Sequence, residues 1–121
     1  MMQHMAIIAD GNRRWAVENN LPPESGYGQG LITIENICMW AIDNNIPYIS
    51  IYAFSTENWS RPKHQIKYLM ELGDEYGLNK IDFYVNLDVK VQFVGRRDRV
   101  DIHFINTVNK IEKATKNCKS L

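Results

Sequence analysis

The stretch HMAIIADGNRRWA, residues 4–16, decides the fold class of this chain. Its apolar run at 5–9 ends abruptly at Asp10 and Gly11. Such a run is typical of a short strand that is buried on both faces of a parallel sheet. A short helix is predicted directly after it, over residues 12–20. The polar side chains that follow the strand are therefore expected at its carboxyl end, where ligands bind in open α/β sheets.

Two more predicted strands alternate with helices along the rest of the chain. Residues 48–54 and 89–95 are rich in β-branched and aromatic side chains and predict the second and third strands. Apolar residues at helix spacing predict helices over 31–45, from after Pro62 into the mid-80s, and near 98–116. This alternation predicts an α/β fold with a parallel β-sheet flanked by helices.

Glycine and proline mark two irregular places in this pattern. Residues 20–30, NLPPESGYGQG, contain two prolines and three glycines and predict a loop. Gly73 and Gly77 fall inside the predicted long helix, where a glycine costs about 1 kcal/mol relative to alanine. We therefore expect a bend or a break in that helix.

The composition bounds the function before any motif is considered. The chain has 14 basic and 14 acidic residues, so its formal net charge is zero and no global field attracts nucleic acid. Its 121 residues, 45% of them hydrophobic, fit a single globular domain, 1–121. Cys38 and Cys118 show no metal-ligand spacing and are expected to be reduced. We find no signal peptide or membrane-length apolar run, and we expect a soluble, cytoplasmic protein whose substrate can still be a lipid.

The first polar cluster, residues 10–14, has the chemistry of a magnesium diphosphate site. Asp10 is a hard oxygen ligand, and Mg²⁺ takes one or two carboxylates together with substrate phosphates. Gly11 lets the backbone approach a ligand, and amides at a helix start favour anions. Arg13 and Arg14 add bidentate phosphate donors. A strand-end turn held by a capping network explains the same residues equally well, so both interpretations stay open.

A second polar cluster, FSTENWSRP at residues 54–62, follows the second predicted strand. It supplies hydroxyl, carboxylate and amide groups, an aromatic face and a further phosphate donor, namely Ser55, Thr56, Glu57, Asn58, Trp59 and Arg61. Taken alone, this cluster favours helix capping before the proline-started helix. A third cluster, GRRDR at 95–99, is expected to be a solvated charged turn.

The two first clusters together resemble the cis-prenyltransferase family, of the undecaprenyl diphosphate synthase (isoprenyl transferase) type. Residues 4–16 match His-x-Ala-x-x-x-Asp-Gly-Asn-x-Arg-Trp-Ala, and residues 52–62 match Tyr-x-Phe-Ser-x-Glu-Asn-Trp-x-Arg-Pro. The resemblance covers nearly all of this chain but only the N-terminal half of a family member. It implies the family's parallel sheet truncated to about three strands and three to four helices.

The resemblance implies a reaction and a set of site residues. Such enzymes elongate farnesyl diphosphate with isopentenyl diphosphate by cis condensation, using Mg²⁺, as in the synthesis of undecaprenyl diphosphate for the cell-wall lipid carrier. By the resemblance, Asp10 holds the metal and the allylic diphosphate, and Asn58 accepts a proton. The substrate-binding residues that it implies are Gly11, Asn12, Arg13, Arg14, Trp15, Tyr27, Ser55, Thr56, Glu57, Trp59 and Arg61. It further implies a homodimer, and a lipid product that can bring the protein to a membrane surface.

Three features depart from the family pattern. Pro23 and Tyr27 stand where the family carries arginine and histidine, so a positive charge is missing there. Gly73 and Gly77 interrupt a helix that normally walls the product tunnel. The chain resembles only the N-terminal half of a family member, and the C-terminal half would carry an arginine-rich block that binds isopentenyl diphosphate and a second acidic metal ligand. A sheet of three strands has a bare edge, which predicts pairing with another chain. A non-catalytic polyprenyl-diphosphate-binding subunit or truncated remnant is therefore the alternative to an active enzyme, and an α/β phosphate-binding module with another ligand is a third hypothesis.

Overall fold

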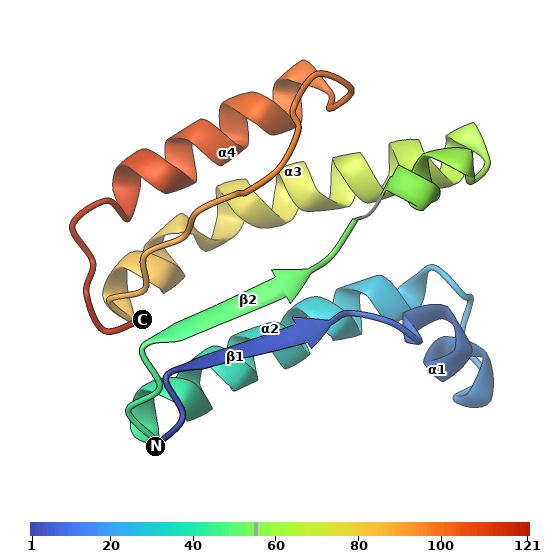
Figure 1. Ribbon diagram of the computed structural model, residues 1–121. Coiled ribbons are helices and arrows are strands. Elements are labelled where there is room, and N and C mark those ends of the chain that lie inside the picture. The colour runs from blue at the N-terminus through green and yellow to red at the C-terminus, as the bar shows by residue number, and fades with distance from the viewer. Residues whose placement is uncertain (55) are drawn as a thin grey trace. The chain divides into compact units, whose positions relative to one another are not determined.

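The computed structural model describes residues 1–54 and 56–121, without the side chains of Thr56 and Glu57. Its elements follow the order β1 (His4–Ile8), α1 (Asn12–Glu18), α2 (Ser25–Asp43), β2 (Tyr48–Tyr52), a 3₁₀ helix (Thr56–Ser60), α3 (Lys63–Asn86) and α4 (Ile102–Ala114) (Figure 1). A parallel strand pair with helices confirms the predicted α/β class. Among the described helices, none combines the length and the apolar character needed to cross a membrane.

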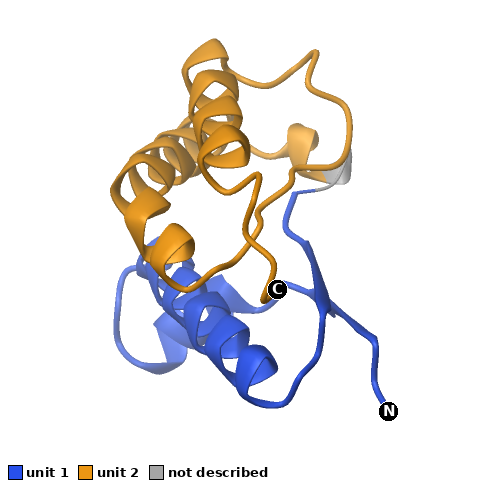
Figure 2. Cartoon of the chain, turned by 90° about the vertical axis from the view of Figure 1, so that its left-hand side faces the viewer, with its two compact units in different colours: residues 1–56 blue, residues 57–121 orange. Residues whose placement is uncertain are grey.

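The chain divides into two compact units, residues 1–56 and 57–121 (Figure 2). The first unit is built on the parallel pair of β1 and β2, whose register joins His4 to Tyr48 and Ile8 to Tyr52. Ala9 continues the ladder, because its N–H donates to the Tyr52 carbonyl at 3.1 Å. The predicted first two strands are thus present, and the single domain expected over the whole chain stays a prediction.

Helix α2 begins at Ser25, so most of the loop predicted over 20–30 is helical, and that prediction is wrong from Ser25 onward. The glycines that suggested a loop serve close packing instead. A Cβ on Gly26 would lie 1.8 Å from the Asn12 carbonyl oxygen, and one on Gly30 would lie 2.8 Å from Asn12 Oδ1. Only residues without a side chain let the start of α2 rest on the start of α1.

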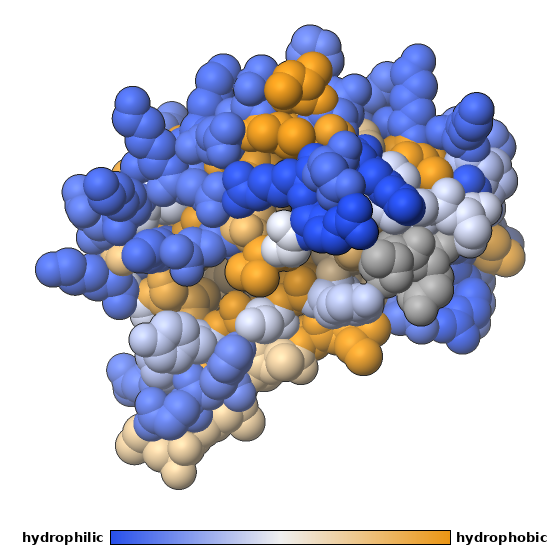
Figure 3. All heavy atoms as spheres, turned by 45° about the horizontal axis from the view of Figure 1, so that its top comes forward, coloured by the Kyte–Doolittle hydropathy of each residue, from blue (hydrophilic) through white to orange (hydrophobic). Residues whose placement is uncertain are grey.

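The second unit pairs α3 with α4 along their lengths (Figure 1). The break expected at Gly73 and Gly77 is absent, since α3 is one helix of 24 residues. A Cβ on Gly73 would lie 2.5 Å from Phe104 Cε2, and one on Gly77 would lie 2.6 Å from Thr107 Cγ2. Both glycines therefore let α4 approach α3. The side of α4 turned away from α3 is mostly hydrophilic (Figure 3).

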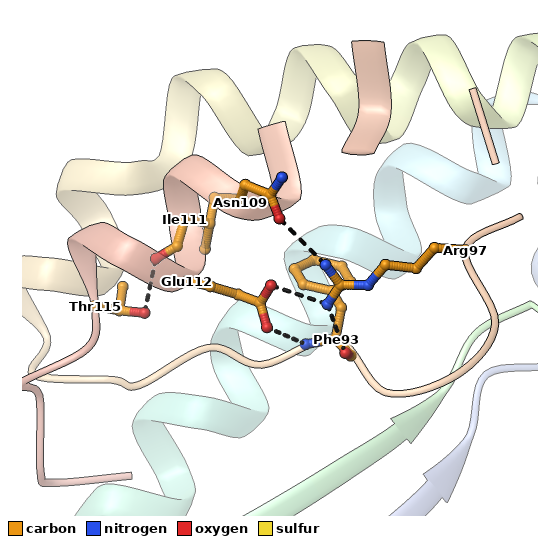
Figure 4. Close-up of polar contacts among 6 residues, drawn as sticks. All are labelled: Phe93, Arg97, Asn109, Ile111, Glu112 and Thr115. Atoms are coloured by element: carbon orange, nitrogen blue, oxygen red, sulfur yellow. Dashed lines mark hydrogen bonds and ion pairs between the residues drawn. The ribbon is translucent and has the colours of Figure 1, made fainter. Parts of the chain in front are cut away.

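Residues 89–95, the predicted third strand, form no strand in the part of the chain that the structure describes, where the sheet has two strands and not three. Two of their backbone donors are bound instead by side chains of α4 and of its C-cap residue. Val91 N–H donates to Thr115 Oγ1 at 3.0 Å. Phe93 N–H donates to Glu112 Oε2 at 3.3 Å (Figure 4). An alternating apolar pattern predicts a strand only when a neighbouring strand is there to pair with it.

The charged segment at 95–99 follows its expectation only in part. Arg96 forms a two-point ion pair with Asp98 at 3.0 and 2.6 Å, and both side chains are exposed, as expected of a solvated turn. Arg97 instead fastens the segment to α4. Its guanidinium donates to Glu112 Oε1 at 2.9 Å and to Asn109 Oδ1 at 3.2 Å (Figure 4).

Candidate functional site

The polar residues at the carboxyl end of β1 gather in one exposed cluster. Asp10 Oδ1 accepts the Gly11 N–H at 2.7 Å, and Asp10 Oδ2 lies 3.5 Å from Arg14 Nη2. The Asp10 and Arg14 side chains keep 79% and 76% of their surface exposed. An ion pair this exposed contributes at most about 1 kcal/mol to stability. The pair therefore leaves a carboxylate and a guanidinium side by side and open to a ligand.

Gly11 makes the turn that creates this arrangement. Its φ of +89° lies in the left-handed region that favours glycine. Its carbonyl accepts the Trp15 N–H at 2.9 Å, which is the first bond of α1, and α1 has no side-chain cap. The amides of residues 12–14 precede that bond and have no partner within the helix. The Asp10–Gly11 bond shows that a strand-end turn is part of the cluster, as the alternative interpretation required.

Arg13 is held by the first turn of α2. Its Nη1 lies 3.4 Å from Glu24 Oε1, and the Arg13 side chain also hydrogen bonds to Tyr27. The bond to Tyr27, assisted by the Glu24 charge, raises the pKa of the Arg13 guanidinium. No local pattern marks these contacts, because they join α1 to α2. Glu24 in particular carries no motif that marks it as a site residue.

A cavity of about 290 Å³ opens beside the two arginines, lined by Arg13, Arg14, Val17, Glu18 and Pro23. Two guanidiniums in its wall favour an anion, and Val17 and Pro23 add apolar surface. Asn12 and Trp15 take other places: the Asn12 side chain lies against Gly30 of α2, and Trp15 keeps 39% of its surface exposed on α1.

The second predicted cluster falls in the second unit from Glu57 onward. Ser55 lies outside the described residues, as do the side chains of Thr56 and Glu57. Asn58 and Trp59 belong to the 3₁₀ helix, and the Arg61 N–H donates to the Asn58 carbonyl at 3.1 Å. α3 begins at Lys63 with Pro62 at its N-cap position and no side-chain cap, and a capping role of Ser55, Thr56 or Glu57 lies outside the described side chains. The approach of Asn58 to Asp10 stays a prediction.

Trp59 borders a second, larger opening of the same unit. This groove has a volume of about 760 Å³ and lies between α3 and residues 98–103. Its wall mixes Ile66 and Met70 with acids and lysines, so it selects no single ligand chemistry.

The first cluster suits a metal that arrives with its substrate. Within the described chain, no three His, Cys, Asp or Glu side chains are grouped to hold a metal ion. Asp10 therefore offers one carboxylate, and a bound Mg²⁺ would take further oxygens from a diphosphate and from water, which is its usual behaviour. The donor set fits a substrate-bridged ion.

Comparison with known proteins identifies the family. The family model described as putative undecaprenyl diphosphate synthase matches residues 8–121. The isoprenyl transferase of Aquifex aeolicus (strain VF5) is 40% identical over 119 residues, which are 98% of this chain and 52% of that protein. The ditrans,polycis-undecaprenyl-diphosphate synthase ((2E,6E)-farnesyl-diphosphate specific) of Micrococcus luteus is 37% identical over 114 residues, which are 94% of this chain and 46% of that protein.

A solved structure agrees with this result at the level of the fold. Lavandulyl diphosphate synthase from Lavandula x intermedia, crystallised in complex with dimethylallyl diphosphate, superposes with a TM-score of 0.90 at 24% identity, over 97% of this chain and 50% of that one. The chain belongs to the cis-prenyltransferase family. It spans about half the length of the curated relatives it matches.

Proposed function

We infer that the chain forms the allylic-diphosphate-binding part of a cis-prenyltransferase that elongates farnesyl diphosphate with isopentenyl diphosphate to a polyprenyl diphosphate, as in undecaprenyl diphosphate synthesis. One observation carries this proposal: Asp10 and Arg14 lie side by side and open to solvent at the carboxyl end of β1. Membership of the family supports the reaction type. The name of the Micrococcus luteus relative supports farnesyl diphosphate as the allylic substrate.

The reaction joins two carbon atoms, expels diphosphate from the allylic substrate and removes one proton from isopentenyl diphosphate. Mg²⁺ on Asp10 would supply positive charge to the departing diphosphate. Arg14 and Arg13 add charge on the same side, where preorganised donors lower the barrier most. Gly11 brings the amides of residues 12–14 to the phosphates. Tyr27 and Glu24 keep the Arg13 guanidinium in place.

The second cluster is assigned to the condensing end of the substrates. Asn58 takes the proton lost in the condensation, and Trp59 and Arg61 bind substrate beside it. Ser55, Thr56 and Glu57 complete this end, while Asn12 and Trp15 shape the diphosphate end. A homodimer, a cytoplasmic location and attraction to membrane surfaces through the lipid product are parts of the same proposal.

The test measures binding before turnover, because the chain spans half of its relatives. Farnesyl diphosphate is titrated calorimetrically into the 121-residue chain with and without Mg²⁺. We expect Mg²⁺-dependent binding that Asp10→Asn weakens about tenfold or more, since the metal ligand is lost. Asp43→Asn is the matched control, because this exposed carboxylate ends α2 away from the cluster. Binding that ignores both Mg²⁺ and Asp10→Asn contradicts the proposal.

The alternative of a non-catalytic binding subunit or remnant is favoured by the same half-length match. A turnover assay with labelled isopentenyl diphosphate distinguishes an active enzyme from a non-catalytic subunit. Long-chain product that disappears in Asp10→Asn supports an active enzyme, whereas Mg²⁺-dependent binding of farnesyl diphosphate without any product supports the subunit.

A further inference from the structure

The zero net charge of the chain conceals an uneven distribution of charge between its two units. Residues 1–56 contain five acidic residues but only two basic ones, Arg13 and Arg14, so their formal net charge with neutral histidine is −3. Residues 57–121 contain the other 12 basic and nine acidic residues and carry +3. The cluster proposed to bind a diphosphate therefore lies in the unit whose overall charge repels an anion.

The same imbalance holds within the cluster itself. Glu24 Oε1 lies 3.4 Å from Arg13 Nη1, and Asp10 Oδ2 lies 3.5 Å from Arg14 Nη2. Glu18 lines the same cavity as the two arginines. Two guanidinium groups are thus accompanied by three carboxylates, and the formal charge of the cluster is −1. A metal-free diphosphate would find hydrogen-bond donors there but no net electrostatic attraction.

The helices that carry Glu18 and Glu24 do not explain these two acids. Glu18 is the last residue of α1, where a negative side chain opposes the helix dipole. Glu24 occupies the N-cap position of α2, but its side chain makes no capping hydrogen bond and contacts Arg13 instead. What the two acids share is a place beside the arginines of the cluster, where each lowers the net positive charge.

A divalent cation would reverse this balance. With Mg²⁺ held by Asp10, the formal charge of the cluster would change from −1 to +1, and a diphosphate would be attracted. If Glu18 and Glu24 were neutral, the cluster would carry +1 without any metal. We propose that Glu18 and Glu24 are selectivity residues, which make diphosphate binding conditional on a divalent cation by offsetting the charge of the two arginines. This inference rests on the proposed function, because it concerns the same site.

The test titrates inorganic diphosphate calorimetrically into the 121-residue chain, once with Mg²⁺ and once with a chelator. The variants are Glu18→Gln, Glu24→Gln and the two combined, because glutamine keeps the length of the side chain and an oxygen that accepts from Arg13. Without Mg²⁺, the combined variant should bind diphosphate about tenfold or more tightly than the unaltered chain, since two repelling charges near the surface are removed. With Mg²⁺ the gain should be smaller, so the ratio of the two affinities should fall severalfold or more.

Asp43→Asn is the matched control. It also removes one negative charge from residues 1–56, but Asp43 ends α2 about 28 Å along the helix axis from Glu24. Exposed charges more than about 8 Å apart are largely screened in physiological salt, so the ratio should stay unchanged in this variant. Glu18 is exposed and the Glu24 side chain keeps 41% of its surface, so glutamine should leave the fold intact, which the unfolding midpoint verifies.

Three outcomes overturn the proposal. One is a ratio that the combined variant leaves unchanged, which is the result expected if Glu24 only positions Arg13 and its loss weakens binding equally with and without Mg²⁺. The second is an equal shift in Asp43→Asn, and the third is no binding of diphosphate by any variant. The proposed function fails separately, because Mg²⁺-dependent binding of farnesyl diphosphate that Asp10→Asn weakens can persist while the two glutamates prove to have no part in it.

Discussion

Replacing Gly26 by alanine tests whether the packing of α2 on α1 builds the polar cluster around Asp10. A Cβ at this position would lie 1.8 Å from the carbonyl oxygen of Asn12, which belongs to the backbone of α1. Contacts of a Cβ below 3.0 Å are essentially never seen, so the two helix starts must separate by about 1.2 Å or more. A backbone carbonyl, unlike a side chain, cannot change rotamer to relieve this contact.

This separation has a calculable effect on the site. Arg13 Nη1 and Glu24 Oε1, now 3.4 Å apart, would move beyond the ion-pair limit of about 4 Å. The bond from Arg13 to Tyr27 crosses the same gap and would be lost with it. A displacement of about 1 Å in a binding group can cost up to about 100-fold in rate. Overpacking of this kind also costs about 1–3 kcal/mol in stability.

The assay compares Gly26→Ala with Gly28→Ala, a matched control in the same turn of α2. A Cβ on Gly28 meets nothing within 4 Å, so Gly28→Ala should stabilise the helix by up to about 1 kcal/mol. Urea unfolding gives the stability, and calorimetry gives the affinity for farnesyl diphosphate with Mg²⁺. We expect Gly26→Ala to lower both the free energy of unfolding and the affinity for farnesyl diphosphate, and Gly28→Ala to lower neither. Equal stability and equal affinity in the two variants would refute the reasoning.

Three further predictions follow from contacts elsewhere in the chain. Tyr27→Phe keeps the ring and removes the hydroxyl that holds Arg13; calorimetry should show severalfold weaker diphosphate binding at an unchanged Tm, and unchanged binding would deny Tyr27 this role. The hydrogen bond from Ser120, with the Lys119 N–H, lowers the pKa of Asp88 below its ordinary value; the stabilising contribution is therefore complete above about pH 4 and is lost as the pH falls through the lower folded pKa, so the hydrogen-exchange protection factors of residues 118–121, corrected for the intrinsic pH dependence of exchange, should fall in acid, but not in Asp88→Asn. Thr115→Val removes the acceptor of the Val91 N–H and should cost about 1–3 kcal/mol in urea unfolding, whereas Thr115→Ser, which keeps the hydroxyl, should cost less; a Thr115→Val variant as stable as the unaltered chain would contradict this role of the hydroxyl.

The parts of the fold that could be predicted are those that neighbouring residues decide. The runs at 5–9 and 48–54 became β1 and β2 because apolar, β-branched and aromatic residues favour strands, although alternate residues of both strands are exposed and the expected burial on both faces is not observed. The pairing of Asp10 with Arg14 is likewise local, since the Gly11 turn joins Asp10 directly to the first turn of α1, which contains Arg14. The third strand failed because pairing depends on a neighbour, and α4 side chains took the donors of Val91 and Phe93.

Glycine shows most clearly why the rest of the site could not be predicted. Gly11 and Gly26 look alike in the sequence, but they are needed for different reasons. Gly11 adopts a φ of +89°, whereas a Cβ on Gly26 would lie only 1.8 Å from the Asn12 carbonyl oxygen. The first requirement is set by the local turn, and the second by Asn12, which lies far away along the chain. The contacts of Arg13 with Glu24 and Tyr27 depend on that second requirement. Hence the motif predicts which groups would meet a diphosphate, whereas the contacts of the Arg13 guanidinium come from packing between α1 and α2 that only the structure reveals.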